Sequence, residues 1–231
     1  MFSAFILHFS DSVLPVGGYA HSFGLEGMVQ MGVVHDVKSL ELFLQRDVWH
    51  GLRNVDLPVA LRAHQLVTNG EFSKLKELDQ QARALRPTHQ LRLASARIGK
   101  QTFSIYEKTW QTGNHQHGDQ DDQLGVKKEH FADFQSPVVV GALFAEQKVS
   151  AEQCLCAVAY QCYSTLLQAS LKILPTGPGS IQQLLYQSMK QVEDNLQEVL
   201  TMKESEWGTY QPVWDIAASR HERSPSRLFI S

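Results

Sequence analysis

The chain has 231 residues, of which 43% are hydrophobic and 19% are charged, and its formal net charge at pH 7 is -3. These values indicate a globular protein with one sizeable core, or at most two small ones, and they exclude an intrinsically disordered chain. The slightly acidic balance gives no attraction to nucleic acid or to an anionic membrane. Because no apolar run approaches the roughly 20 residues that cross a bilayer, we expect neither of these partners.

The start of the sequence and its cysteines bear on the compartment. The opening residues MFSAFILHFSDS contain no basic stretch and no small-residue cleavage site, so we do not expect a signal peptide. The three cysteines, Cys154, Cys156 and Cys162, form an odd, clustered set that is a poor disulfide framework. Both features favour a cytoplasmic protein.

Apolar residues recur at the helical period along the first half of the chain. Asp36 is a good N-cap for the first clear helix, which Gly51 and residues 54–56 would end. Pro58 suits the first turn of the next helix, where a missing N–H costs little. The predicted helices cover about residues 36–51, 58–69, 71–86 and 88–110, and Pro87 separates the last two.

The second half begins with residues 111–128, which have little apolar content and three glycines, so we predict an exposed loop. Ser136 is predicted to be the N-cap of a helix whose first residue is the proline that follows it. Ser150 and Ser180 fit capping boxes with glutamines three positions later, and each is predicted to begin a long helix. Residues 175–179 would separate these two helices, and a polar break near 208–212 would precede a last short helix and the tail.

No segment alternates convincingly at the period of a β-strand. The sequence therefore predicts an all-α protein of about eight to ten helices. Because no linker-like stretch precedes a second core, we expect residues 1–231 to form a single-domain bundle. The expected loop at about 111–128 and a C-terminal tail at about 213–231 would project from it.

A search for catalytic motifs finds almost nothing. The sequence contains no GxxxxGK[ST] or GxGxxG phosphate loop, no GxSxG nucleophile elbow and no HExxH metal motif. Cys154 and Cys156 are two residues apart, so on a helix they would point about 200° apart and could not easily bind one ion. We therefore expect small core-filling thiols, no catalytic residue, no cofactor and no metal site there.

One cluster has a composition that suits a metal ion. His115 and His117 precede three aspartates, and imidazole with carboxylate would suit nickel or zinc. The segment also looks like a floppy loop, and binding there must overcome the entropy of ordering it. A solvated linker is the favoured interpretation, with a nickel carrier as the alternative.

The stretch from Asp11 to Glu26 is the most unusual local sequence. Pro15 fixes φ, and the glycine pair at 17–18 permits a tight turn that would present Tyr19, His21 and Ser22 before a helix near Phe23. A purely structural turn and a binding surface are equally compatible with this pattern.

A second stretch is rich in arginine. Five basic residues lie within eighteen positions: Arg83, Arg86, Arg92, Arg97 and Lys100. Arginines could clamp an anion or supply a charge to a partner's phosphate site. A solvated helix face or internal ion pairs are the favoured interpretation.

The C-terminal tail is the third stretch. It ends on Leu228, Phe229 and Ile230, which would be unusual to leave in water, beside Arg227. These residues dock either on their own core or on another protein. The enrichment of arginine and aromatic residues at interface hot spots slightly favours the second.

Four signatures in order, from about residue 8 to the end, resemble the UreF family of urease accessory proteins. A single one is weak, whereas all four at this spacing are specific. They are Leu14-Pro15-Val16-Gly17-Gly18 with Ser22-Phe23-Gly24-Leu25-Glu26; Arg83, Arg92, Ser95 and Gly99; Ile173-Leu174-Pro175-Thr176-Gly177 with Gln182 and Gln183; and His221-Glu222 with Arg227-Leu228-Phe229-Ile230-Ser231. The chain departs from the family at Lys172, where an arginine is common, and residues 111–128 find no match.

The resemblance implies an all-α fold, a homodimer, and assembly with the accessory protein UreD (also called UreH) and the GTPase UreG to deliver nickel to the urease apoprotein. It implies a scaffold and regulator rather than an enzyme. It also implies partner-binding roles for Arg220, His221, Glu222, Arg227, Leu228 and Phe229 and, less directly, for Pro15, Gly17, Gly18, Tyr19, His21 and Ser22. Two alternatives stay open: a nickel carrier using His115 and His117, and direct activation of the GTPase by Arg83, Arg86, Arg92 or Arg97.

Overall fold

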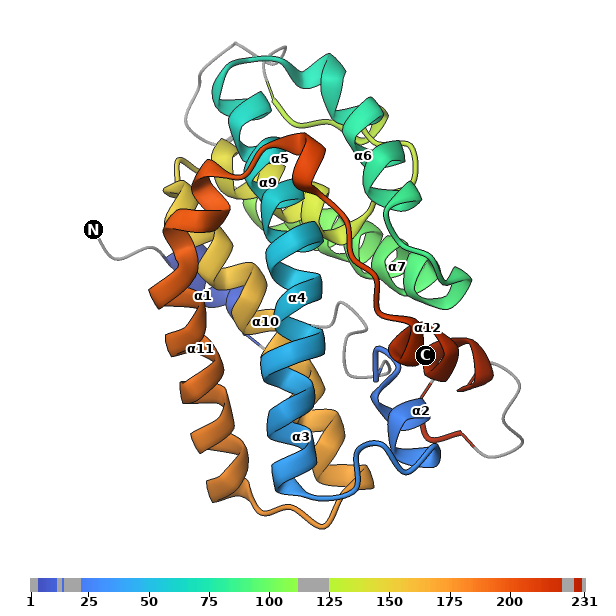
Figure 1. Ribbon diagram of the computed structural model, residues 1–231. Coiled ribbons are helices and arrows are strands. Elements are labelled where there is room, and N and C mark those ends of the chain that lie inside the picture. Colours follow the sequence, from blue (N-terminus) through green and yellow to red (C-terminus); the bar gives the residue numbers. More distant parts are fainter. Residues whose placement is uncertain (1–3, 12–13, 15–21, 112–124, 222–226, 230–231) are drawn as a thin grey trace.

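The computed structural model describes residues 4–11, 14, 22–111, 125–221 and 227–229 (Figure 1). All regular elements in this part are helical, which confirms the all-α prediction. The longer helices are α1 (Ala4–Ser10), α2 (Leu25–Gln30), α3 (Val37–Phe43), α5 (Leu57–Thr68), α6 (Leu75–Ala84), α7 (His89–Tyr106), α9 (Ser136–Glu146), α10 (Ala151–Ile173), α11 (Pro178–Thr201) and α12 (Pro212–His221). In the described residues no helix has the length and apolar character needed to span a membrane.

Short helical pieces complete the fold. They are α4 (Trp49–Gly51), the π-helical segments η2 (Leu44–Val48), η3 (Leu52–Asp56) and η5 (Glu107–Gln111), and the 3-10 turns η4 (Phe72–Lys74), η7 (Lys128–His130) and η8 (Glu204–Glu206). α3, η2, α4, η3 and α5 follow one another directly and form one helical rod over residues 37–68 (Figure 1).

The predicted break at Gly51 and residues 54–56 is therefore wrong. The rod continues through Pro58 because another donor replaces the hydrogen bond that proline cannot make. Proline has no N–H, so the carbonyl of Asn54 loses the donor that it would have in a regular α-helix. The N–H of Gly208 donates to that carbonyl at 3.0 Å instead. The local π-helical geometry of η3 also spreads the turn at this point.

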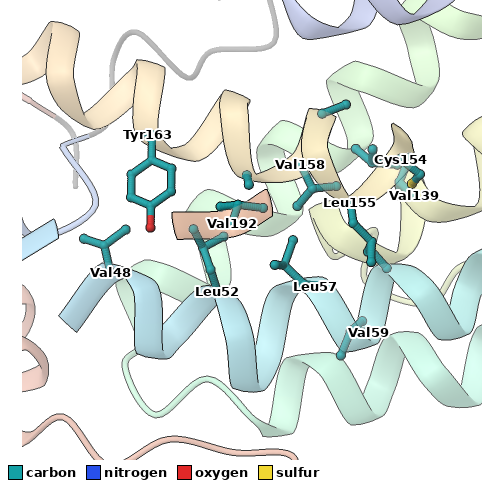
Figure 2. Packing of buried hydrophobic residues seen from close by; sticks show 14 of the residues in the cluster. Val48, Leu52, Leu57, Val59, Val139, Cys154, Leu155, Val158, Tyr163 and Val192 are labelled. Atoms are coloured by element: carbon teal, nitrogen blue, oxygen red, sulfur yellow. The ribbon is translucent and has the colours of Figure 1, made fainter. Parts of the chain in front are cut away.

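The rod is the centre of the bundle. α10 and α11 run beside it, and α9 packs against α5 while α7 covers α9 (Figure 1). Figure 2 shows side chains from the rod facing side chains of α9, α10 and α11. The labelled residues are Val48, Leu52, Leu57, Val59, Val139, Cys154, Leu155, Val158, Tyr163 and Val192. They belong to one cluster of buried residues that reaches from α1 to the tail.

The predicted helix starts at Asp36, Thr88 and Ser150 agree with the structure, whereas those at Ser136 and Ser180 differ. The side chains of Asp36, Thr88 and Ser150 cap α3, α7 and α10. α11 instead begins at Pro178, because proline fits the first helical turn, and Ser180 therefore lies inside the helix. Ser136 is the first residue of α9 rather than its cap.

The expected exposed loop at 111–128 differs from the structure at its C-terminal end. Val126 is fully buried, and its N–H donates to Oε1 of Glu146 at 2.9 Å. An apolar side chain close to the core is more stable inside than in water, so the chain packs there. Residues 112–124, with His115 and His117, lie outside the described residues.

A buried aspartate fixes the entry into α9. Asp79 on α6 accepts hydrogen bonds from the backbone N–H groups of the four residues 132–135, at 2.6–2.9 Å. Burial raises the pKa of Asp79, and the four donors oppose that rise. Because one carboxylate satisfies four N–H groups, it holds α6 against the start of α9.

Candidate interaction site around the C-terminal tail

Ser22 lies just before α2 and caps the backbone of its first turn. Its Oγ accepts a hydrogen bond from the N–H of Glu26 at 3.3 Å, and its carbonyl accepts one from Leu25 at 2.9 Å. Ser22 is fully buried, so the structure gives it an internal role and we leave it out of the proposed contact surface. Its predicted companions Pro15, Gly17, Gly18, Tyr19 and His21 lie outside the described residues.

Two glycines let α12 lie directly on α2. Gly24 has φ of +84°, and a Cβ there would come within 2.6 Å of Trp214 Nε1, which donates to the carbonyl of Phe23 at 2.7 Å. A Cβ on Gly27 would come within 2.3 Å of the carbonyl oxygen of Ala217. The backbones of the two helices therefore meet with no room for a side chain between them.

We expect Gly27→Ala to displace α12 and to lower the free energy of unfolding by about 1–3 kcal/mol, since the added methyl group collides with backbone. Hydrogen exchange over residues 212–221 should accelerate in the same variant. Gly177→Ala is the matched control, because a Cβ at that position would meet nothing within 4 Å. Equal exchange of α12 in both variants would contradict the close packing.

The carboxylate of Glu26 joins the two ends of the described chain. Its Oε2 lies 2.7 Å from Nε2 of His221 and 3.1 Å from the N–H of Phe229, and its Oε1 accepts from the N–H of Leu228 at 2.9 Å. Glu26 is 5% exposed and His221 is 1% exposed. We call these three hydrogen bonds the tail clasp. A buried carboxylate needs such donors, and here they come from a residue of α12 and from the tail.

The two apolar side chains of the described tail residues 227–229 lie on opposite sides. Phe229 is 4% exposed and packs into the core, with Lys172 Nζ 5.1 Å from its ring centroid. Leu228 is 71% exposed. This cation–π contact attaches the tail to Lys172 of α10. In this conformation the ring of Phe229 is not available to a partner, whereas Leu228 is.

His221 and Phe229, both expected to touch a partner, are thus buried parts of the chain that hold the tail in place. Arg220, Arg227 and Leu228 remain exposed, and we call these three residues the tail surface. Neither arginine makes an ion pair with another described residue. Glu222 lies outside the described residues.

Three of the four candidate arginines are already engaged. Arg83 pairs with Asp133 at 3.4 Å, and Arg86 pairs with Asp56. Arg92 donates to the carbonyls of residues 86 and 87 at 2.7 and 2.9 Å. Only Arg97 among these four is exposed and has no ion pair within the described part of the chain. The interpretation as internal ion pairs therefore fits Arg83 and Arg86.

Of the three cysteines, Cys154 lies in the core, whereas Cys156 and Cys162 are half-buried. Cys154 is buried, and burial raises its pKa; burial raises the pKa of Cys162 to about 12. Both groups are therefore thiols rather than thiolates at neutral pH. Across the described ranges, no three His, Cys, Asp or Glu residues gather in a way that could hold a metal ion. The nickel-carrier alternative, which depends on His115 and His117, stays a prediction.

Glu26 and Lys172 are the functional residues whose roles were not predicted. A glutamate in the first turn of a helix is ordinarily explained by the helix dipole, which gave no reason to expect a clasp. The signal was its position inside an otherwise apolar turn, where a solvated side chain would not fit.

The fold and the tail clasp define an all-helical protein in the described residues. Its C-terminal segment is held on its own core and exposes the tail surface. Comparison with known proteins then gives the family. A family model described as UreF matches residues 34–189, and the chain belongs to this family.

Relatives resemble the chain over almost its full length. The urease accessory protein UreF of Trichormus variabilis is 25% identical over 98% of this chain and 94% of its own. The protein of the same name from Dechloromonas aromatica is 26% identical over 98% and 96%, and that from Teredinibacter turnerae is 27% identical over 98% and 97%. Such coverage leaves no large unmatched region on either side and supports an accessory role in urease maturation.

Proposed function

We propose that this chain is a non-catalytic, cytoplasmic scaffold of urease maturation. It binds a UreD/UreH-like accessory protein and the GTPase UreG, as a homodimer, so that nickel enters the urease apoprotein in a GTP-dependent step. The observation that carries this proposal is the family match together with relatives named urease accessory protein UreF along nearly the whole chain.

The tail surface supports the proposal structurally. Leu228 is an apolar side chain held in water, beside exposed arginines of the type common at interface hot spots. Because the tail clasp already orders the backbone of Leu228, binding does not have to order it again. We assign this surface to the UreD/UreH-like partner.

Reconstitution of urease tests the proposed function as a whole. Urease apoprotein, the UreD/UreH-like protein, UreG, nickel and GTP are combined with and without this chain, and the nickel bound to urease is measured by mass spectrometry. We expect nickel loading to require this chain and GTP together. Equal loading in its absence would contradict the proposal.

Leu228→Ser is expected to weaken binding to the UreD/UreH-like protein about tenfold, which corresponds to about 1.4 kcal/mol, because an apolar contact is lost. The free energy of unfolding should not change, since the side chain is in water. Tyr186→Ser, also 71% exposed but on α11, is the matched control. Calorimetry of the three proteins with the partner checks this. Deleting residues 220–231 is a poorer test because it also removes the partners of Glu26.

Direct activation of the GTPase is a second candidate function, and the exposure of Arg97 favours it. An arginine that stabilises the transition state by bidentate contact is not replaced by lysine. Single-turnover GTP hydrolysis by UreG is measured with wild type, Arg97→Lys and Arg83→Lys. A stimulation lost only in Arg97→Lys would support activation. Hydrolysis at the rate of UreG alone with all three proteins would exclude it.

A further inference from the structure

One face of α7 carries exposed cations beside an apolar residue. Leu93, Arg97 and Lys100 are separated by four and three positions, so they lie on the same side of the helix. Leu93 is 37% exposed, and both cations are exposed. We call these three residues the α7 stripe.

The stripe is positive although the chain is not. The eighteen residues of α7 include no aspartate or glutamate, whereas the whole chain has 24 acidic residues against 21 lysines and arginines. Arg97 and Lys100 form no ion pair with any residue that the structure describes. Two exposed cations therefore lie on one helix face, and neither is paired with a described carboxylate.

A groove continues the stripe at the start of the helix. It has a volume of about 550 Å³ and lies between the first turn of α7 and α12, where His89 and Gln90 face Ile216 and Arg220. Ile216 is 48% exposed and supplies an apolar wall. Arg220 and the positive end of the α7 dipole add to the positive potential, and Asp215 is the acidic residue in the lining. The two helices lie beside each other in Figure 1.

We propose that the α7 stripe and this groove bind an acidic segment of a protein partner. Carboxylates of that segment face Arg97, Lys100 and Arg220, and an apolar side chain from it covers Leu93 or Ile216. The charge complementarity that carries the proposal is the acid-free helix with its unpaired cations. The inference rests on the proposed function, since the partner is taken to be an accessory protein of urease maturation.

Charge reversal tests the site. We measure the rate at which this chain associates with the UreD/UreH-like protein, with UreG, and with both together. The measurement compares wild type with Arg97→Glu/Lys100→Glu. We expect the rate with one of these partners to fall at least about tenfold at low salt and the difference to shrink as salt is raised. Lys38→Glu/Arg46→Glu is the control, because it changes the net charge equally at two exposed cations on the rod.

The outcomes separate the two proposals. If wild type assembles and both double variants associate as fast as wild type, the site is overturned while the proposed function stands. If the two variants lose rate equally, the effect is one of net charge, and the site is also overturned. If wild type forms no complex with either partner, the proposed function fails and the α7 site fails with it.

Zero-length carbodiimide cross-linking identifies the contact, because it joins a lysine amine to a carboxylate only at direct contact distance. We expect a link from Lys100 to an aspartate or glutamate of the partner in the wild-type complex. Lys100→Arg should retain binding and lose this link. Links from Lys38 in the same complex with none from Lys100 would overturn the site.

Discussion

Glu26→Ala is expected to lower the free energy of unfolding by about 3–5 kcal/mol, because it removes a buried acceptor of three hydrogen bonds. The substitution removes the acceptor for His221 and for the two tail N–H groups, and it leaves a buried imidazole and backbone donors without partners. Urea unfolding of wild type and variant measures the change. Glu77→Ala, at an exposed glutamate of α6, is the control and should shift the midpoint little.

The same variant should also lose affinity for the UreD/UreH-like partner, because Leu228 is then no longer held in position. Glu26→Gln is the intermediate case. Its amide retains an acceptor oxygen but turns an NH₂ donor toward one of the tail donors, so part of the clasp should survive. A Glu26→Ala protein as stable as wild type would show that the clasp contributes nothing to the fold.

Asp79→Ala is expected to cost a similar amount, about 3–5 kcal/mol, because one substitution removes the acceptor of four backbone N–H groups. The segment 132–135 should then become susceptible to limited proteolysis before the rest of the chain. Glu77→Ala lies two positions away on α6 and again serves as the control. Asp79→Asn keeps a single acceptor oxygen and should fall between the two.

If Asp79→Ala and Glu77→Ala unfold at the same urea concentration, the role of Asp79 in joining α6 to α9 is disproved. Proteolysis that begins elsewhere in Asp79→Ala, with residues 132–135 still protected, would contradict it as well. This pair of variants tests the fold alone, since Asp79 is distant in sequence from the tail surface and takes no part in the tail clasp.

Most helices were predictable because their signals are local. The apolar period, the break at Pro87 and the caps at Asp36 and Ser150 need only neighbouring residues, and they place the starts of α3, α7 and α10 correctly. The break expected near Pro58 was wrong for a non-local reason. The carbonyl that proline leaves without a donor is satisfied by Gly208, which lies far along the chain, and no local pattern announces that contact.

The segments that form the site could be predicted from the sequence, but not which of their residues are buried and which are exposed. The last of the four signatures singled out the tail, but the tail has no periodicity from which to decide whether Leu228 or Phe229 turns inward. That choice depends on Lys172 of α10 and on Glu26 of α2. The need for glycine at position 27 likewise arises only because the backbone of Ala217 lies against it. The site is formed by contacts between residues that are far apart in the sequence. The sequence pattern therefore indicated which segments form the site but not which residues contact one another.

The central claim is that the free chain already holds its tail on its own core, with Leu228 facing outward. Hydrogen exchange at the amides of Leu228 and Phe229, in the protein without any partner, tests this most directly. We predict slow exchange in wild type and fast exchange in Glu26→Ala, since both amides donate to Glu26. Exchange at the rate of an unstructured peptide in wild type would contradict the account.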